Sequence, residues 1–390
     1  MSRLRVLQLG KYYPPEKGGM ERVVATLCRG ENTLVESSAL VCNKGRATTV
    51  EQIDGVTVRR VGSLATVGAV TLAPALPAWL ARTPADVIVL HEPNPMALLA
   101  YFIARPRVPL VVWFHSEVIR PRWQYRLLYE PLLKFALGRA SCVVTSSPPL
   151  LDAAPLAPYR DKCRAIPLGI PVERYVASAG VMTEAAQRRR AAPRPVLLFV
   201  GRLVGYKGVD ILLRAMPGLK ADLVIVGDGP RRASLESLAG ELRVLDQVRF
   251  VGEVTDDELL AWYHASDVFV LPSVTRQETF GVVQLEAMLC GRPSVSTEVG
   301  TGSSWVNQHE QTGLVVPPRD PAALHAALAR LVTDPGLRRR LGARARGRVL
   351  ERFTADRLCE STVALYRELT GIVEPLQEPA VGVQGAVEMS

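Results

Sequence analysis

The feature of this sequence that most limits its fold is a series of short, largely apolar segments with helical segments between them. In the first part of the chain these segments are Val6–Leu9, Ala39–Cys42, Val56–Val61, Asp86–Leu90, Pro109–Phe114 and Cys142–Thr145. A strand with one face in water alternates apolar and polar residues, whereas a continuously apolar strand must be covered on both faces. The sequence therefore predicts a parallel sheet with helices on each side.

The same pattern lapses and then begins again. The second series consists of Val196–Val200, Asp222–Val226, Val248–Val251, Val268–Leu271, Pro293–Thr297 and Leu314–Val316. Between the two series lie Pro171, Pro193, Pro195 and the basic run Arg188–Arg190, a composition typical of a linker. At about 100–200 residues per domain, a chain of 390 residues also favours two domains.

We therefore expect an α/β protein with two facing, Rossmann-like, doubly wound parallel-sheet domains. The first domain would span residues 1–170, a linker 171–195 and the second domain 196–353. A C-terminal helix over 354–371 would pack back on the first domain, and 372–390 would form a tail. Ligands of open parallel sheets bind beyond the carboxyl ends of the strands, so two facing sheets predict a site in the cleft between them.

The amino-acid composition excludes some classes of protein but does not by itself identify the function. The chain is 48% hydrophobic and 22% charged, which excludes a disordered protein, and its net charge of +9 suits nucleic acid, a membrane surface or a phosphorylated small molecule. The cations gather in Arg188–Arg190 and Arg338–Arg348 without interleaved aromatic residues, which argues against nucleic acid. Six widely spaced cysteines and an N-terminus that reads as a strand predict a cytoplasmic protein.

Glycine-bearing loops follow several predicted strands. Gly18 and Gly19 open a helix and could bring backbone amides to a phosphate, although an ordinary strand-to-helix turn would look the same. Arg202 and Lys207 follow the strand that ends at Val200, and two cations there suit a diphosphate; two solvated surface cations are the alternative. Gly227 lies in a turn that either admits a ligand or only starts a helix.

The most informative motif is a pair of glutamates, Glu278 and Glu286, with seven residues between them. Eight helical steps separate two residues by about 12 Å, beyond the ~5–9.5 Å of the carboxylate pair in a glycosidase. The two glutamates should therefore hold two ends of one extended ligand. The amides of Thr279, Phe280 and Gly281 could meet phosphate or hydroxyl oxygens, and Glu286 could accept from ribose hydroxyls. The alternative is a pair of solvated helix charges.

In this order the motifs resemble the family 4 retaining glycosyltransferases, which have the GT-B architecture, over about residues 3–370. The resemblance implies that Arg202 and Lys207 bind the donor diphosphate, that Glu278 contacts the transferred sugar and that Glu286 holds the ribose. In related enzymes a histidine at the position of His115 lies near the sugar, and His91 occupies a similar strand end. The chain departs from the common family pattern at Thr301 and Ser304, where a glycine and a glutamate are usual.

Finer features resemble bacterial enzymes that build O-antigen, capsule or exopolysaccharide, several of which use GDP-mannose. We therefore expect retaining transfer of a hexose, mannose first, from a nucleotide diphosphate sugar to a saccharide or a polyprenyl-diphosphate-linked saccharide. The chain contains no Asp-x-Asp motif, so we expect no metal and no cofactor. A UDP-sugar-dependent glucosyl- or N-acetylglucosaminyltransferase is the enzyme alternative, and a nucleotide-sugar-binding scaffold without turnover is the alternative of another class.

One segment mixes aromatic residues with cations. Pro121–Arg139 contains Trp123, Tyr125, Arg126 and Lys134, a pattern typical of a helix that lies at a membrane interface. A helix packed into the core with its cations reaching solvent would give the same pattern. The first interpretation predicts peripheral contact with an anionic membrane on its inner face, where a lipid-linked acceptor would lie.

Overall fold

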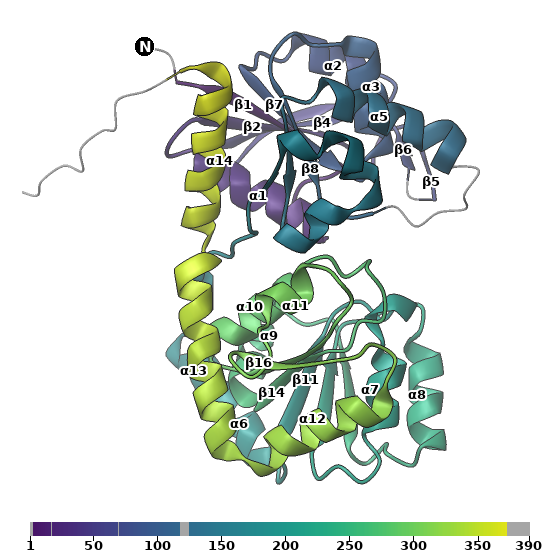
Figure 1. The fold of residues 1–390 in the computed structure, drawn as a ribbon, viewed down its shortest axis with the longest axis vertical. Coiled ribbons are helices and arrows are strands. Elements are labelled where there is room, and N and C mark those ends of the chain that lie inside the picture. The colour runs from purple at the N-terminus through teal and green to yellow at the C-terminus, as the bar shows by residue number, and fades with distance from the viewer. Residues whose placement is uncertain (1–2, 17, 69, 118–124, 373–390) are drawn as a thin grey trace, which may run out of the picture.

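The computed structural model describes residues 3–16, 18–68, 70–117 and 125–372. Two α/β units stand one above the other, and the last two helices run along the same side of both (Figure 1). Each unit contains one predominantly parallel sheet between helices. The prediction of two doubly wound parallel-sheet domains is confirmed.

The first sheet has eight strands in the order β10-β9-β8-β7-β1-β2-β4-β3, all parallel except for the β3–β4 pair. Its strands are β1 (Arg5–Leu9), β2 (Glu36–Cys42), β3 (Thr49–Ile53), β4 (Val56–Val61), β7 (Val87–Glu92), β8 (Leu110–Phe114), β9 (Cys142–Thr145) and β10 (Cys163–Ala165). Its helices are α1 (Gly19–Glu31), α2 (Leu76–Arg82), α3 (Pro95–Ala104) and α5 (Glu130–Arg139), and β5 (Ala65–Val67) and β6 (Val70–Leu72) form a separate hairpin.

The second sheet has six parallel strands in the order β13-β12-β11-β14-β15-β16. They are β11 (Val196–Val200), β12 (Asp222–Val226), β13 (Val248–Gly252), β14 (Val268–Leu271), β15 (Ser294–Thr297) and β16 (Gly313–Val316). The helices around it are α6 (Ala179–Ala191), α7 (Val209–Ala215), α8 (Arg232–Glu241), α9 (Asp256–Ala265), α10 (Val282–Leu289), α11 (Gly302–Val306), α12 (Pro321–Thr333) and α13 (Pro335–Arg352). The final helix is α14 (Ala355–Thr370).

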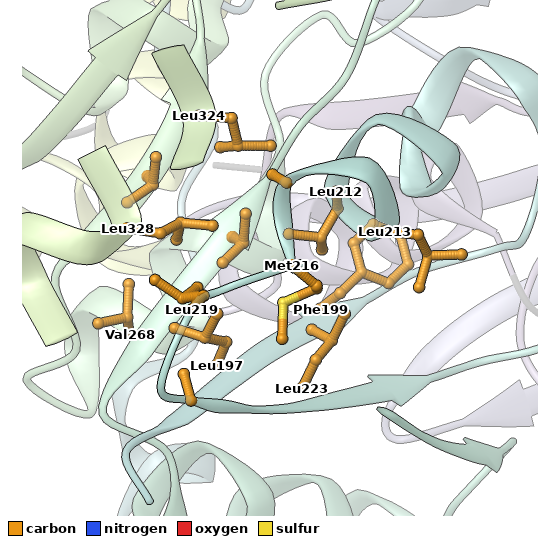
Figure 2. Close-up of a cluster of buried hydrophobic side chains, with 14 of the residues drawn as sticks. Leu197, Phe199, Leu212, Leu213, Met216, Leu219, Leu223, Val268, Leu324 and Leu328 are labelled. Atoms are coloured by element: carbon orange, nitrogen blue, oxygen red, sulfur yellow. The ribbon is translucent and has the colours of Figure 1, made fainter. Parts of the chain in front are cut away.

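Strand β11 shows why its sequence has to be apolar throughout. Leu197 and Phe199 point into the core beneath α7 and α12, where Leu212 and Leu328 meet them (Figure 2). The alternate residues of the same strand, including Leu198, belong to a different buried cluster on the side of α6 and α9. Both faces of the strand are therefore buried away from water. The place for polar functional groups is then its carboxyl end.

Three features differ from the sequence-based expectations. Strand β3 was not predicted because it alternates half-buried and exposed residues at the sheet edge, and β10 is only three residues long. Residues 171–195, expected to be a linker, contain α6, which buries Val181 and Ala185 against the second sheet's helices. Near the C-terminus the chain returns to the first domain, where α14 packs on α1.

Within the described ranges, no helix combines the length and the apolar character needed to cross a bilayer.

Candidate active site

A buried ion pair lies at the carboxyl ends of two neighbouring strands of the second sheet. Lys207 follows β11 and Glu278 follows β14, and the Lys207 Nζ atom lies 2.6 Å from Glu278 Oε2. The Ser273 hydroxyl donates to the same carboxylate oxygen at 2.8 Å. Burial opposes the charged form of Lys207, but the Glu278 charge, the hydrogen bond to Glu278 and the nearby Tyr206 together raise the pKa of the ammonium. Lys207 is therefore a fixed, charged donor and not a solvated surface cation.

The second predicted cation has a different environment. Arg202 is exposed, and its side chain has no hydrogen-bond or ion-pair partner among the residues that the structure describes. Its loop is held by the turn after β12, because a Cβ atom on Gly227, where φ is 120°, would lie 2.2 Å from the Gly201 carbonyl oxygen. Gly227 thus permits close packing of two loops of the chain itself. Lys207 is therefore held by the Glu278 carboxylate, whereas Arg202 is available to an anion.

Helix α10 begins at Val282, four residues after Glu278. Gly281 precedes the helix in the left-handed conformation, with φ of 73°, and a Cβ atom there would lie 2.6 Å from Leu271 Cδ2. In the described structure no side chain caps the first amides of this helix. The Thr279 carbonyl accepts from the Gly302 amide at 2.8 Å, and the Phe280 ring packs edge-on against Phe353. The helix amides, rather than the side chains of Thr279 and Phe280, are suited to an anion.

Glu286 is 1% exposed and both of its oxygens have partners. Oε1 accepts from Arg22 at 2.8 Å, and Oε2 accepts from the Tyr263 hydroxyl at 2.7 Å. Arg22 belongs to α1 of the first domain, so this ion pair joins the two domains, and the Glu286 charge raises the pKa of Arg22. Glu286 is therefore not a solvated helix charge, and a ribose hydroxyl would have to share it with Arg22.

The glycine pair of the first domain lies one turn before Arg22. Gly18 is extended at the amino end of α1, and a Cβ atom on it would lie 2.0 Å from Glu21 Oε2. Gly19 has open space where its Cβ would be. Burial raises the pKa of Glu21. The carboxyl group of Glu21 thus occupies the space beside Gly18, so a phosphate at this helix end would meet it first.

Two histidines lie at neighbouring strand ends of the first domain. His91 belongs to β7 and His115 follows β8, and His91 Nδ1 lies 2.8 Å from His115 Nε2. The two rings are nearly parallel to each other and to the Trp113 ring, with interplanar angles of 10–12° and centroids 5.2–5.8 Å apart. Burial lowers the pKa of His115 to about 3 and that of His91 well below its usual value. Both imidazoles are therefore neutral at physiological pH.

The histidine and glutamate loops meet across the domain boundary. Arg276, two residues before Glu278, donates to the Gly300 carbonyl at 2.6 Å and lies 3.4 Å from the Glu117 carboxylate, two residues after His115. The Thr301 hydroxyl donates to the Glu278 carbonyl oxygen. Thr301, which departs from the family pattern, therefore supports the loop that carries Glu278.

The structure brings together Lys207 with Glu278 and His115 with His91, whereas Glu286 pairs with Arg22 and Arg202 stands apart. Sequence reasoning missed Ser273, Tyr263 and Arg22. Ser273 could have been found as a polar residue two positions after a strand, but nothing in the sequence pairs Tyr263 or Arg22 with Glu286. Among the described residues, no group of three His, Cys, Asp or Glu side chains is placed to share a metal ion.

Comparison with known proteins places both halves of the chain. Residues 182–348 match the model of the glycosyl transferases group 1 family, and residues 18–169 match that of the glycosyl transferase 4-like domain. The chain is 35% identical to D-rhamnosyltransferase WbpZ of Pseudomonas aeruginosa over 90% of this chain and 93% of that protein. It is 34% identical to O-antigen chain mannosyltransferase C of Escherichia coli over 73% of this chain and 76% of that protein.

Solved structures share the fold over nearly the whole chain. Sucrose-phosphate synthase from Thermosynechococcus elongatus superposes with a TM-score of 0.77 and 25% identity, covering 95% of this chain and all of that one. The Anabaena protein HepE in complex with UDP-glucose gives a TM-score of 0.74 at 21% identity, covering 94% of this chain and all of that one. At that identity the second likeness concerns the fold alone.

The Lys207–Glu278 pair predicts a specific pattern of stabilities. Lys207→Met should lower the free energy of unfolding by about 3–5 kcal/mol, because it leaves a buried carboxylate without its counter-charge. Lys207→Met/Glu278→Gln should recover most of that loss. Urea unfolding of Lys207→Met, Glu278→Gln and the double variant measures both effects. A double variant whose loss of stability equals the sum of the two single losses would contradict the pair.

The depressed pKa of His115 predicts acid sensitivity. An unfolded histidine binds a proton below a pH of about 6.5, whereas folded His115 does so only near pH 3. Stability should therefore fall as the pH drops from 6.5 towards 3, and at pH 5 His115 should account for about 2 kcal/mol of that loss. His115→Gln should lose about that much less stability than the wild type between pH 7 and pH 5. Urea unfolding at pH 7 and pH 5 measures the loss for each protein. Equal losses of unfolding free energy in the wild type and in His115→Gln would contradict the depressed pKa of His115.

Proposed function

The chain belongs to the family 4 glycosyltransferases of GT-B architecture that act in polysaccharide synthesis, and from this premise we propose its finer activity. It moves a hexose, mannose first, from GDP-mannose to a saccharide or polyprenyl-diphosphate-linked saccharide, with retention at the anomeric carbon. The observation that carries this proposal is the Lys207 ammonium held 2.6 Å from Glu278 at the strand ends that face the other domain.

Two relatives support mannose or a close analogue as the sugar. One is named as an O-antigen mannosyltransferase and the other as a D-rhamnosyltransferase, and D-rhamnose is mannose without the oxygen at C6. A third relative, from Mycobacterium tuberculosis, is named as GDP-mannose-dependent and is 36% identical over 52% of this chain. The name of this third relative favours a guanosine donor. A UDP-sugar remains the alternative donor that the assay below separates.

The site residues suggest how transfer proceeds. Lys207 and Arg202 bind the diphosphate and neutralise the charge that grows on it as the sugar departs. The leaving phosphate oxygen takes the proton of the acceptor hydroxyl while that hydroxyl oxygen bonds to the anomeric carbon on the same face. No enzyme nucleophile is then needed, and Glu278 positions the sugar. Because two cations and the α10 amides surround the phosphates, we propose that no metal is required.

A non-catalytic scaffold is the second candidate. A protein that only binds nucleotide sugars needs cations for the phosphates, but it has no use for a charged ammonium buried against a carboxylate at the leaving group. The arrangement of Lys207, Glu278 and Ser273 as one hydrogen-bonded group favours catalysis.

A membrane-facing surface supports the lipid-linked acceptor. In the described part of the predicted interfacial segment, Tyr129 and Leu133 pack into the core, while Leu127 is 69% exposed and Leu128 is 67% exposed. Residues 118–124, with Arg122 and Trp123, lie outside the described residues. Helix α3, which packs on α5, exposes Phe102 and Ile103, and Lys134 of α5 is also exposed. We propose that this apolar surface contacts an anionic membrane at the inner face of the cell.

Donor use tests the proposed activity directly. The purified protein should release GDP from GDP-mannose or its 6-deoxy analogue when given a saccharide acceptor, and EDTA should not reduce the rate. UDP-glucose and UDP-N-acetylglucosamine are assayed in parallel, and NMR of the product reports its anomeric configuration. An inverted product or metal-dependent turnover would overturn that part of the proposal, and binding without turnover would support the scaffold.

The role of Lys207 is tested in the same assay. Lys207→Ala should lower kcat by about 10²-fold, because it removes a charge that stabilises the leaving group. Arg214→Ala, on the exposed side of α7, is a matched control that removes a cation elsewhere in the same domain. Wild-type turnover in Lys207→Ala would exclude the proposed role.

Vesicle binding tests the membrane surface. Leu127→Ser/Leu128→Ser should reduce co-sedimentation with anionic phospholipid vesicles at low salt, because it removes two exposed apolar side chains. Leu245→Ser, which changes a 55% exposed leucine of the second domain, is the control. Equal binding of the double variant and the wild type would contradict the proposal.

A further inference from the structure

A chain of buried polar side chains connects His115 to the last helix of the protein. It runs from His115 through His91 and Gln8 to Glu31, and from Glu31 to α14. Gln8, Glu31 and His91 are each 0% exposed, whereas His115 is 9% exposed. The accessible end of the chain is therefore His115, at the carboxyl end of β8.

Glu31 fixes the direction of the hydrogen bonds. Its Oε2 accepts from the Gln8 amide nitrogen at 2.9 Å and from the Ser37 hydroxyl at 3.2 Å. Its Oε1 accepts from Thr362 at 2.8 Å and from Tyr366 at 3.1 Å, both on α14. An ionised carboxylate can only accept. Gln8 must therefore turn its amide nitrogen towards Glu31 and its carbonyl oxygen away from it.

That carbonyl oxygen determines the tautomers of the two histidines. Gln8 Oε1 lies 2.8 Å from His91 Nε2, which must carry a hydrogen in order to donate to it. A neutral His91 then has a lone pair on Nδ1, which lies 2.8 Å from His115 Nε2. His115 Nε2 must therefore carry the hydrogen of the next bond. In the neutral ring this leaves His115 Nδ1 as an acceptor.

We propose that Gln8 and His91 are positioning residues that hold His115 in the tautomer protonated at Nε2, so that its Nδ1 accepts a hydrogen bond from a hydroxyl of the bound sugar substrate. The proposal rests on the sugar-transfer function for the identity of that hydroxyl, while the tautomer itself follows from the hydrogen bonds alone. Among the described residues, no side chain or backbone group occupies His115 Nδ1.

The opposite arrangement is disfavoured by the same contacts. If the Gln8 amide were reversed, its oxygen would face Glu31 Oε2 at 2.9 Å and two acceptors would be in contact. His91 would then have to donate from Nδ1, and His115 would present a hydrogen at Nδ1 instead of a lone pair. Such a ring could donate to the sugar but could not accept from its hydroxyl.

The tautomers can be read by NMR of the full-length protein labelled with ¹⁵N-histidine. Burial raises the pKa of Glu31 to about 7, so spectra are recorded at pH 8.5, where its carboxylate is ionised. Long-range ¹H–¹⁵N spectra should show His115 with a protonated Nε2 and an unprotonated Nδ1. A wild-type His115 protonated at Nδ1 would overturn the proposal without the need for any variant.

Gln8→Met tests the source of the tautomer, because it keeps the side-chain length and removes the acceptor for His91 Nε2. A detectable population of His115 protonated at Nδ1 is expected, with kcat about tenfold lower and the donor KM within twofold of wild type. An unchanged His115 signal in Gln8→Met would overturn the proposal.

Thr362→Val is the matched control for a purely structural effect. It removes a donor to Glu31 Oε1 but leaves the Gln8 contact at Oε2, so it should lower the unfolding midpoint without altering the His115 tautomer. Loss of the tautomer in Thr362→Val would show that general loosening, and not Gln8, sets the state of the ring. Since the spectra need no substrate, an absence of transferase activity would refute the sugar-transfer function and leave the tautomer assignment standing.

Discussion

Burial of parallel strands on both faces is the constraint on which the rest of this structure depends. Residues of β11 alternate between two separate apolar cores, so a polar side chain inside the strand would be costly on either side. Polar chemistry is thereby confined to the loops at the carboxyl ends, where Lys207, Glu278 and His115 all lie. The fold thus places the candidate site before any particular side chain is chosen.

The boundary between the domains is polar where these loops meet. Arg22 of α1 pairs with the buried Glu286 of α10, and Arg276 links the Glu278 loop to Glu117. Arg22 is 54% exposed at the side chain, and Glu286 also has a bond to Tyr263 within its own domain. The Arg22–Glu286 pair therefore orients the two domains relative to each other, while Glu286 remains held by Tyr263 within its own domain.

The sequence-based analysis worked where one local pattern decides the outcome. Continuous apolar runs located β11 through β16. The sequence-based analysis failed where the structure depends on a contact between residues that are far apart in the sequence. The basic run in residues 171–195 was interpreted as a linker, but Arg188 of α6 lies 4.3 Å from the Trp262 ring centroid and donates to the Glu258 carbonyl, so the run packs on α9.

The partners of the predicted site residues illustrate the same limit. Arg22 and Glu286 are 264 positions apart, and no periodicity or motif connects them. The sequence motif pointed to Glu278. The Lys207 ammonium lies beside it only because β11 and β14 are neighbours in the sheet. Local patterns therefore predict which residues stand at the site, and the packing of the two sheets decides which of them touch.

Gln8, like His91 in β7, departs from the apolar pattern of the buried strands, since it lies within β1 and is fully buried. Its cost is offset because both ends of the amide are bonded, one to His91 and the other to Glu31. Glu31 in turn needs Thr362 and Tyr366, which α14 supplies from the far end of the chain. The polar interior of the first domain is consequently complete only when the last helix has docked, so the support of His115 depends on a segment that is translated more than 200 residues after it.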